Sequence, residues 1–242
     1  MKRFKIDYSF LLIVLILCFS PKQYLIFKLL FCLCIHELGH LIFVVLLRYK
    51  IAHLKLSIFG FFMELDHVKE EAYKDLLIFS AGILMNLLCF LCIPDEDIRL
   101  FSFILLVVNI LPIYPLDGFN ILKTIASFFF PFYFVLKILS ILSLVLSFFI
   151  ILLSIYLKMD LFLNLNFAYL CMINVVLYSK TDIHYQKFLL NKTLYVYNYP
   201  VKRIHFHSNF QKFFYKYHTI EVAIGNKIVS QEELLSSRNV KN

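Results

Sequence analysis

Long apolar stretches dominate the chain, and short polar stretches separate them. A membrane-crossing helix needs about 20 predominantly apolar residues. The pattern therefore predicts an α-helical polytopic membrane protein with about six transmembrane helices. We place them at residues 8–20, 24–47, 76–93, 98–119, 134–157 and 161–178. The first is short for a crossing, and Pro131 and Lys137 interrupt the start of the fifth.

The stretch between the second and third crossings is too charged to enter a membrane as a helix. Its middle, HLKLSIFGFFMEL at residues 53–65, is rich in β-branched and aromatic residues around Gly60. This pattern predicts two short strands that turn near the glycine. We expect a short membrane-associated β-hairpin here. Non-helical backbone at membrane depth must pack on protein or line a water-filled cavity.

The chain becomes polar after the last crossing. We therefore predict an intramembrane domain over residues 1–179 and a small cytoplasmic tail over residues 180–242. The stretch TIEVAIGNKIVSQEELL, residues 219–235, predicts a strand, a turn at Gly225–Asn226, a second strand and a helix. About 60 residues is marginal for an independent core, so we expect the tail to dock on another part of the protein.

Composition and charge support a membrane protein. Hydrophobic residues make up 61% of the chain, which is more apolar surface than a soluble domain of this length can bury. The net charge of +8 does not indicate a nucleic-acid partner, because the basic residues flank the crossings and populate the tail. With the N-terminus inside, the basic residues concentrate on the inner side. We predict a multi-pass protein of a bacterial cell membrane with both termini in the cytoplasm.

The second predicted crossing contains the motif HELGH. An ionisable residue inside a crossing is costly and is therefore a functional hypothesis by default. His36 and His40 are four residues apart, so a helix places them on one face, one turn apart. That spacing allows both imidazoles to bind one zinc ion, with Glu37 beside the metal as general base.

A catalytic zinc ion has three protein ligands and one open position. Asp117, in the stretch NILPIYPLDGFN, is the best candidate for the third ligand. Pro112 and Pro115 break the helix just before it, which can aim the carboxylate at the metal. Asn86 and Asn109 have two interpretations that both stay open: hydrogen bonds between helices, or binding of the substrate backbone.

Three motifs together resemble the site-2 proteases, a family of intramembrane zinc metalloproteases. These are HELGH, SAGILMN at residues 80–86 and NILPIYPLDG at residues 109–118. The layout is most similar to the sporulation stage IV FB branch of the family. The sequence departs from the family at Ile83, where proline is usual, and at Phe119, where a second glycine is common. The tail resembles at best half of a nucleotide-binding CBS unit.

The resemblance implies hydrolysis of a peptide bond in or near the transmembrane segment of a membrane-tethered protein, such as a pro-sigma factor. It also implies one Zn²⁺ ion and a role for Asn109 in shaping the substrate site. The implied catalytic base is Glu37, and the implied ligands are His36, His40 and Asp117.

Besides the substrate, we expect the lipid bilayer and regulatory membrane proteins as partners. An oligomer is compatible with the sequence, and we expect no nucleic-acid partner. The alternative is a membrane zinc-binding protein without proteolytic activity, either a scaffold or a transporter. A transporter would show ligands along a path and inverted repeats, which the sequence lacks. A scaffold would usually have lost Glu37. Other membrane HExxH peptidases need a later glutamate as third ligand, and the crossings offer no good candidate.

Overall fold

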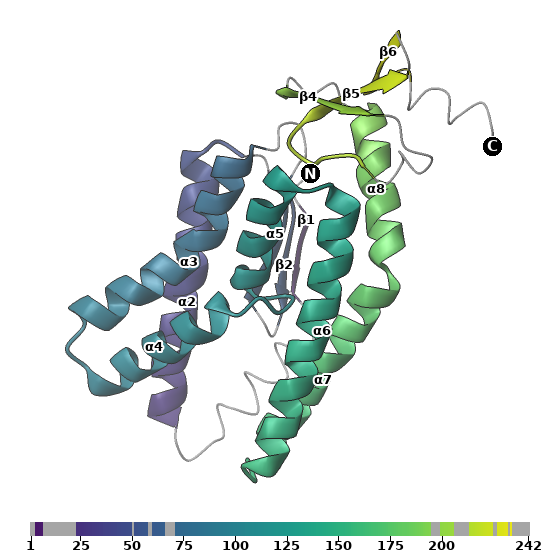
Figure 1. Ribbon diagram of the computed structural model, residues 1–242. Helices are drawn as coiled ribbons and strands as arrows, with labels where there is room; N and C mark the ends of the chain where they lie inside the picture. The colour runs from purple at the N-terminus through teal and green to yellow at the C-terminus, as the bar shows by residue number, and fades with distance from the viewer. Residues whose placement is uncertain are drawn as a thin grey trace. The chain divides into compact units, whose positions relative to one another are not determined.

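The computed structural model describes residues 3–6, 23–49, 51–57, 60–65, 71–194, 199–205, 213–224, 227–231 and 233 (Figure 1). The first predicted crossing, residues 8–20, lies outside these ranges. The chain divides into two compact units, which are described separately below. One comprises Met1–His67 with Tyr73–Ile121, and the other Val68–Ala72 with Leu122–Asn242. The predicted domain boundary at residue 179 stays a prediction.

The first unit contains a three-stranded sheet, formed by β1 (Arg3–Ile6), β2 (Ile51–Ser57) and β3 (Gly60–Leu65). Strand β2 lies in the middle, parallel to β1 and antiparallel to β3. The turn from β2 to β3 places Ser57 opposite Gly60. Strands β2 and β3 lie where the sequence predicts them, and their association with the membrane stays a prediction. Strand β1 was not predicted.

The helices of the first unit are α2 (Gln23–Leu46), α3 (Ala72–Cys92), α4 (Glu96–Ile110) and the first turn of α5 (Asp117–Phe129). Helices α2 and α3 approach each other closely at Gly39. A Cβ atom added there would lie 2.8 Å from the carbonyl oxygen of Ala81 and 2.6 Å from Cγ of Met85. Small residues at a crossing point allow two membrane helices to meet backbone to backbone.

Polar contacts fix the start of helix α4. The carboxylate of Asp95 accepts a hydrogen bond from the backbone N–H of Ile98 at 3.0 Å and so caps the helix. The ammonium of Lys28 on α2 lies 2.7 Å from Asp95 and 2.8 Å from Asp97, which ties the two helices together.

The predicted fourth crossing, residues 98–119, needs correction. Helix α4 ends at Ile110, since proline at position 112 cannot continue it. Its 15 residues span only about 22 Å, less than the roughly 30 Å of a bilayer core. Asp117 therefore begins the next helix, α5, rather than ending the fourth crossing.

The second unit is built on two long helices that lie side by side, α6 (Phe132–Tyr156) and α7 (Leu161–Ser179) (Figure 1). Buried hydroxyls of α6 meet asparagines of α7. Ser143 Oγ donates to Asn174 Oδ1, and Ser154 Oγ donates to Asn164 Oδ1 at 2.6 Å. Such bonds hold apolar helices together where hydrophobic burial between them is weak.

The tail consists of helix α8 (Thr181–Leu194), which was not predicted, and a second sheet. The sheet contains β4 (Val201–His205), β5 (Thr219–Ile224) and β6 (Lys227–Ser230). Strand β5 is central, parallel to β4 and antiparallel to β6. The tail shares one core with the start of α6, so it docks as expected. That core comprises Phe132, Tyr133, Leu136, Tyr185, Leu189, Phe214, Tyr215, Ile220 and Val222.

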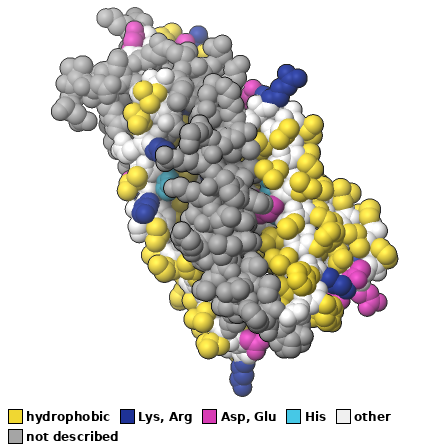
Figure 2. Space-filling view, turned by 180° about the vertical axis from the view of Figure 1, so that it is seen from behind, with side chains coloured by type: hydrophobic (Ala, Val, Ile, Leu, Met, Phe, Trp, Pro, Cys, Tyr) yellow, Lys and Arg dark blue, Asp and Glu magenta, His cyan; other side chains and the backbone are white. Residues whose placement is uncertain are grey.

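The described helices are those of a membrane protein. Three of them, α2, α3 and α6, are long and apolar enough to cross a bilayer, and α7 contains a shorter apolar stretch, Leu163–Ser179. On the face drawn in Figure 2, hydrophobic side chains cover most of the described surface and charged side chains are sparse. The number of crossings and the sides of the termini stay predictions.

Candidate metal centre

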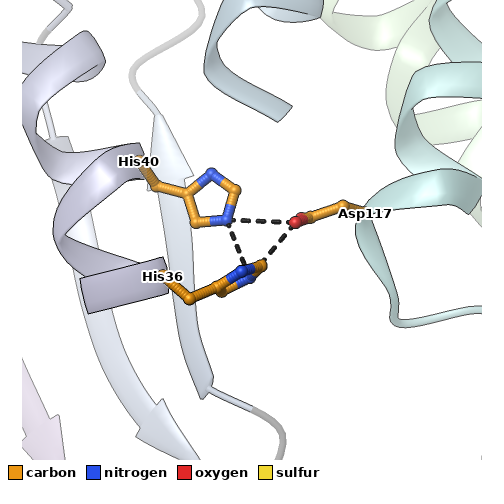
Figure 3. A group of neighbouring side chains, drawn as sticks. All are labelled: His36, His40 and Asp117. Carbon is orange, nitrogen blue, oxygen red and sulfur yellow. Dashed lines mark hydrogen bonds and ion pairs between the residues drawn. The ribbon is translucent and has the colours of Figure 1, made fainter. Parts of the chain in front are cut away.

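His36, His40 and Asp117 converge on one point in the first unit (Figure 3). Both histidines project from α2, and Asp117 projects from the first residue of α5. Asp117 Oδ2 lies 3.2 Å from Nε2 of each histidine, and the two Nε2 atoms lie 3.3 Å apart. All three side chains are buried or nearly so, with exposed fractions of 4%, 8% and 13%.

The three distances fit the edges of a zinc tetrahedron. Zinc binds imidazole nitrogen and carboxylate oxygen at about 2.0–2.1 Å, which at tetrahedral angles separates neighbouring ligand atoms by about 3.3 Å. Although two histidine nitrogens lie 3.2 Å away, this carboxylate oxygen makes no hydrogen bond within the described part of the chain. A buried acceptor of this kind needs a cation or a proton. The donor set therefore suits a zinc ion with one position left open.

A backbone carbonyl orients His40 for this role. Nδ1 of His40 lies 2.7 Å from the carbonyl oxygen of Ile78 on α3. A carbonyl only accepts, so Nδ1 carries the proton and donates it. Nε2 of a neutral His40 therefore presents a lone pair toward Asp117, as a metal ligand requires.

Gly82 provides the space that the two histidine rings occupy. A Cβ atom added to Gly82 would lie 2.5 Å from Cε1 and 2.7 Å from Nε2 of His36, and it would also collide with Nε2 of His40. No side chain fits there without moving the rings. The glycine of SAGILMN thus lies directly against the ligand nitrogens.

The loop before α5 fixes the position of Asp117. Ile113 in this loop is 1% exposed, and the ring of Tyr114 packs edge-on against Phe119 at 5.5 Å. Gly118 lies against the carbonyl of Ile110, where a Cβ atom would collide. Phe119, where the resembled family commonly has glycine, is 2% exposed and belongs to the packing of this loop.

Of the other predicted site residues, Glu37 and Asn86 lie beside the histidines. Glu37 follows His36 on α2 and is 6% exposed. Asn86 on α3 lies with its amide nitrogen 2.9 Å from Nδ1 of His36. Asn109 donates from Nδ2 to the carbonyl of Leu105 in its own helix at 3.0 Å. A substrate contact by either asparagine stays a prediction.

Two groups that position the histidines were not predicted from the sequence: the backbone carbonyl of Ile78 and Gly82. A backbone carbonyl has no sequence signal at all. The glycine inside the apolar run of α3 was a signal of close approach, because glycine is unfavourable in a helix unless it serves packing.

Comparison with known proteins finds a match among solved structures. No protein-family model matches the chain, and no curated protein matches it. Among solved structures, the chain is similar to the site-2 protease from Methanocaldococcus jannaschii, with a TM-score of 0.52 and 20% sequence identity. The match covers 75% of this chain and 89% of that chain. At this identity the likeness shows the fold: the chain has the fold of that protease.

Proposed function

We propose that the chain is an intramembrane zinc metalloprotease of the site-2 protease type. The observation that carries the proposal is the triangle of His36, His40 and Asp117, whose edges of 3.2, 3.2 and 3.3 Å match a zinc tetrahedron. The shared fold supports it independently of the three residues. Its substrate is a membrane-tethered protein, cut in or near its transmembrane segment.

The residues of the site have separate roles in the proposed hydrolysis. His36, His40 and Asp117 hold the ion. A zinc ion, when bound, lowers the pKa of a water molecule and polarises a carbonyl group. Glu37 accepts a proton from the attacking water and later delivers it to the leaving amine. The hydroxyl adds to the carbonyl carbon, the C–N bond breaks, and the products are a carboxylate and an amine.

The outer edge of strand β3 is a pairing site for an extended segment of the substrate. In the described part of the chain β3 pairs only with β2, which leaves the outer edge of β3 for a third partner. Strand addition supplies backbone hydrogen bonds whatever the side chains are. Proline substitutions along residues 54–64 remove donors from this sheet. They should impair cleavage, and undiminished cleavage would argue against strand pairing.

The charge pattern supports a site that opens to the cytoplasm. Basic residues concentrate on one side of the crossings if the N-terminus is inside, and the tail is basic as well. Cleavage would then release a membrane-tethered regulator inward, such as a pro-sigma factor. The sporulation branch of the family rests on the motif resemblance alone.

Glu37→Gln tests the reaction. The chain is expressed with single-span membrane proteins that carry a cytoplasmic reporter, and cleavage and zinc content are measured. Glu37→Gln should keep one zinc ion per chain and lose cleavage by about 100-fold or more. Normal cleavage by this variant would refute the mechanism. Undiminished zinc in Asp117→Ala would remove Asp117 from the ligand set.

The same experiment tests the alternative of a scaffold or transporter. That alternative predicts a wild-type chain that binds zinc and cleaves none of the tethered proteins. Because zinc content and cleavage are measured separately, binding without hydrolysis is distinguished from a failure to bind.

A further inference from the structure

The amide of Asn86 lies directly against a metal ligand on the side away from the metal. Its nitrogen is 2.9 Å from Nδ1 of His36, and the asparagine has no exposed surface. The contact joins α3 to α2 across 50 positions of sequence. Its oxygen, Oδ1, is buried and has no hydrogen-bond partner among the described residues.

Zinc binding through Nε2 of His36 determines the state of the other ring nitrogen. Nε2 faces Asp117 and His40 at 3.2 and 3.3 Å, so Nε2 is the atom that can bind the ion. A neutral imidazole that binds through one nitrogen carries its proton on the other. Nδ1 of His36 then needs an acceptor, just as Nδ1 of His40 has the carbonyl of Ile78.

The acceptor for His36 is the Asn86 oxygen. The oxygen and nitrogen of an amide have nearly the same shape, so their assignment follows from the hydrogen bonds that they make. Turning the Asn86 amide by half a turn brings Oδ1 to Nδ1–H of His36. The turned amide pairs an oxygen that otherwise lacks a donor.

We propose that Asn86 is a positioning residue of the metal centre, which accepts the Nδ1 proton of His36 through its side-chain oxygen. The bond fixes the tautomer that presents the Nε2 lone pair, and it fixes the ring plane. The proposal rests on the proposed zinc site. It differs from the substrate contact predicted from the sequence, which needs an exposed side chain. The two histidines are then oriented by the same helix, α3, one by a backbone carbonyl and one by an amide.

Two substitutions separate the acceptor from the packing. Asn86→Leu keeps a similar volume and removes the acceptor, whereas Asn86→Asp keeps the shape and provides only acceptors. Zn²⁺ affinity is measured by competition with a chelator on the full chain in detergent. Loss of an outer-shell partner typically weakens metal affinity by 10–100-fold, so we expect about that loss in Asn86→Leu. Asn86→Asp should bind at least as tightly as wild type.

Asn174→Leu is the matched control, because Asn174 is equally buried and hydrogen-bonded but lies in the second unit. Its zinc affinity should equal that of wild type. Wild-type affinity in Asn86→Leu would overturn the proposal. Equal weakening in Asn86→Asp and Asn86→Leu would overturn it as well, since the side chain would then act through packing.

A spectroscopic measurement keeps the test decisive even if Asn86→Leu does not fold. A carboxylate in place of the amide raises the basicity of the ligand imidazole. The visible absorption of the Co²⁺-loaded Asn86→Asp variant should therefore shift relative to Co²⁺-loaded wild type. An unchanged spectrum would refute the hydrogen bond. Both readouts are independent of proteolysis, so an inactive chain that binds zinc leaves this inference standing.

Discussion

Gly82→Ala should abolish zinc binding, although it adds a single methyl group. The added carbon would lie 2.5 Å from Cε1 and 2.7 Å from Nε2 of His36. Ordinary contacts between such atoms are about 3.5 Å or longer, so the ring must retreat by about 0.8–1.0 Å. His40 must move too, because its Nε2 would also collide.

A retreat of this size exceeds what the metal tolerates. Bond lengths in a zinc site hold within about 0.2 Å. Both imidazoles would move out of range together, and loss of ligands should weaken affinity by more than the 10–100-fold typical of an outer-shell change. Zinc stoichiometry and chelator competition on the purified chain measure the effect, and thermal unfolding of the metal-free protein measures stability.

Gly39→Ala provides the contrast for this experiment. Its added carbon would meet Met85 Cγ at 2.6 Å and the Ala81 carbonyl oxygen at 2.8 Å, and no ligand nitrogen is among its nearest neighbours. Overpacking of this kind costs about 1–3 kcal/mol, so we expect lower stability of the metal-free protein. If Gly82→Ala binds one zinc ion with wild-type affinity, the geometry of the centre given above is wrong.

Two further predictions concern the packing around the site and the tail. Hydrogen bonds from Lys28 hold the pKa of the Asp95 carboxyl below its ordinary value of 3.8. The ionised carboxylate therefore stabilises the fold above about pH 4, and this stabilisation is lost as the pH falls through the lowered pKa. Lys28→Met should make the stability of the protein depend less on pH in acid unfolding curves. An unchanged pH dependence would show that the Lys28–Asp95 contact does not stabilise the fold. Leu189→Ala, at a position 2% exposed, should destabilise the docked tail by about 2–5 kcal/mol and speed its proteolysis, whereas Leu190→Ala at an exposed position should not.

The candidate site was predictable because its signals are local. The spacing of His36 and His40 fixes their relation as soon as the segment is helical, and the apolar stretch around them ensures that it is. Asp117 was recognisable because two prolines before it rule out a continuous helix. The same prolines should have shortened the predicted crossing, since α4 ends at Ile110.

The parts that escaped prediction depend on distant pairings. Strand β1 pairs with β2 across about 50 positions, with Arg3 opposite His53, and a four-residue strand has no periodicity of its own to announce it. Helix α5 (Asp117–Phe129) begins two residues after Pro115 and was not predicted as a separate helix. Gly82 marks a close approach, but the sequence does not say which helix approaches it, because α2 and α3 are apolar on every side. The contact of α3 with α2 that brings Gly82 and Asn86 to the histidines was therefore not predicted.

The arrangement around the two histidines explains why a divalent cation suits the centre better than a proton. With Nδ1 of His40 donating to Ile78, and Nδ1 of His36 donating to Asn86 as proposed, both Nε2 atoms present lone pairs inward. The carboxylate oxygen of Asp117 adds a third acceptor at 3.2 Å from each. A single proton can bridge only one pair of these atoms at a time. A zinc ion would bind all three at once. With three protein ligands, its fourth position would be open for the water that the proposed hydrolysis consumes.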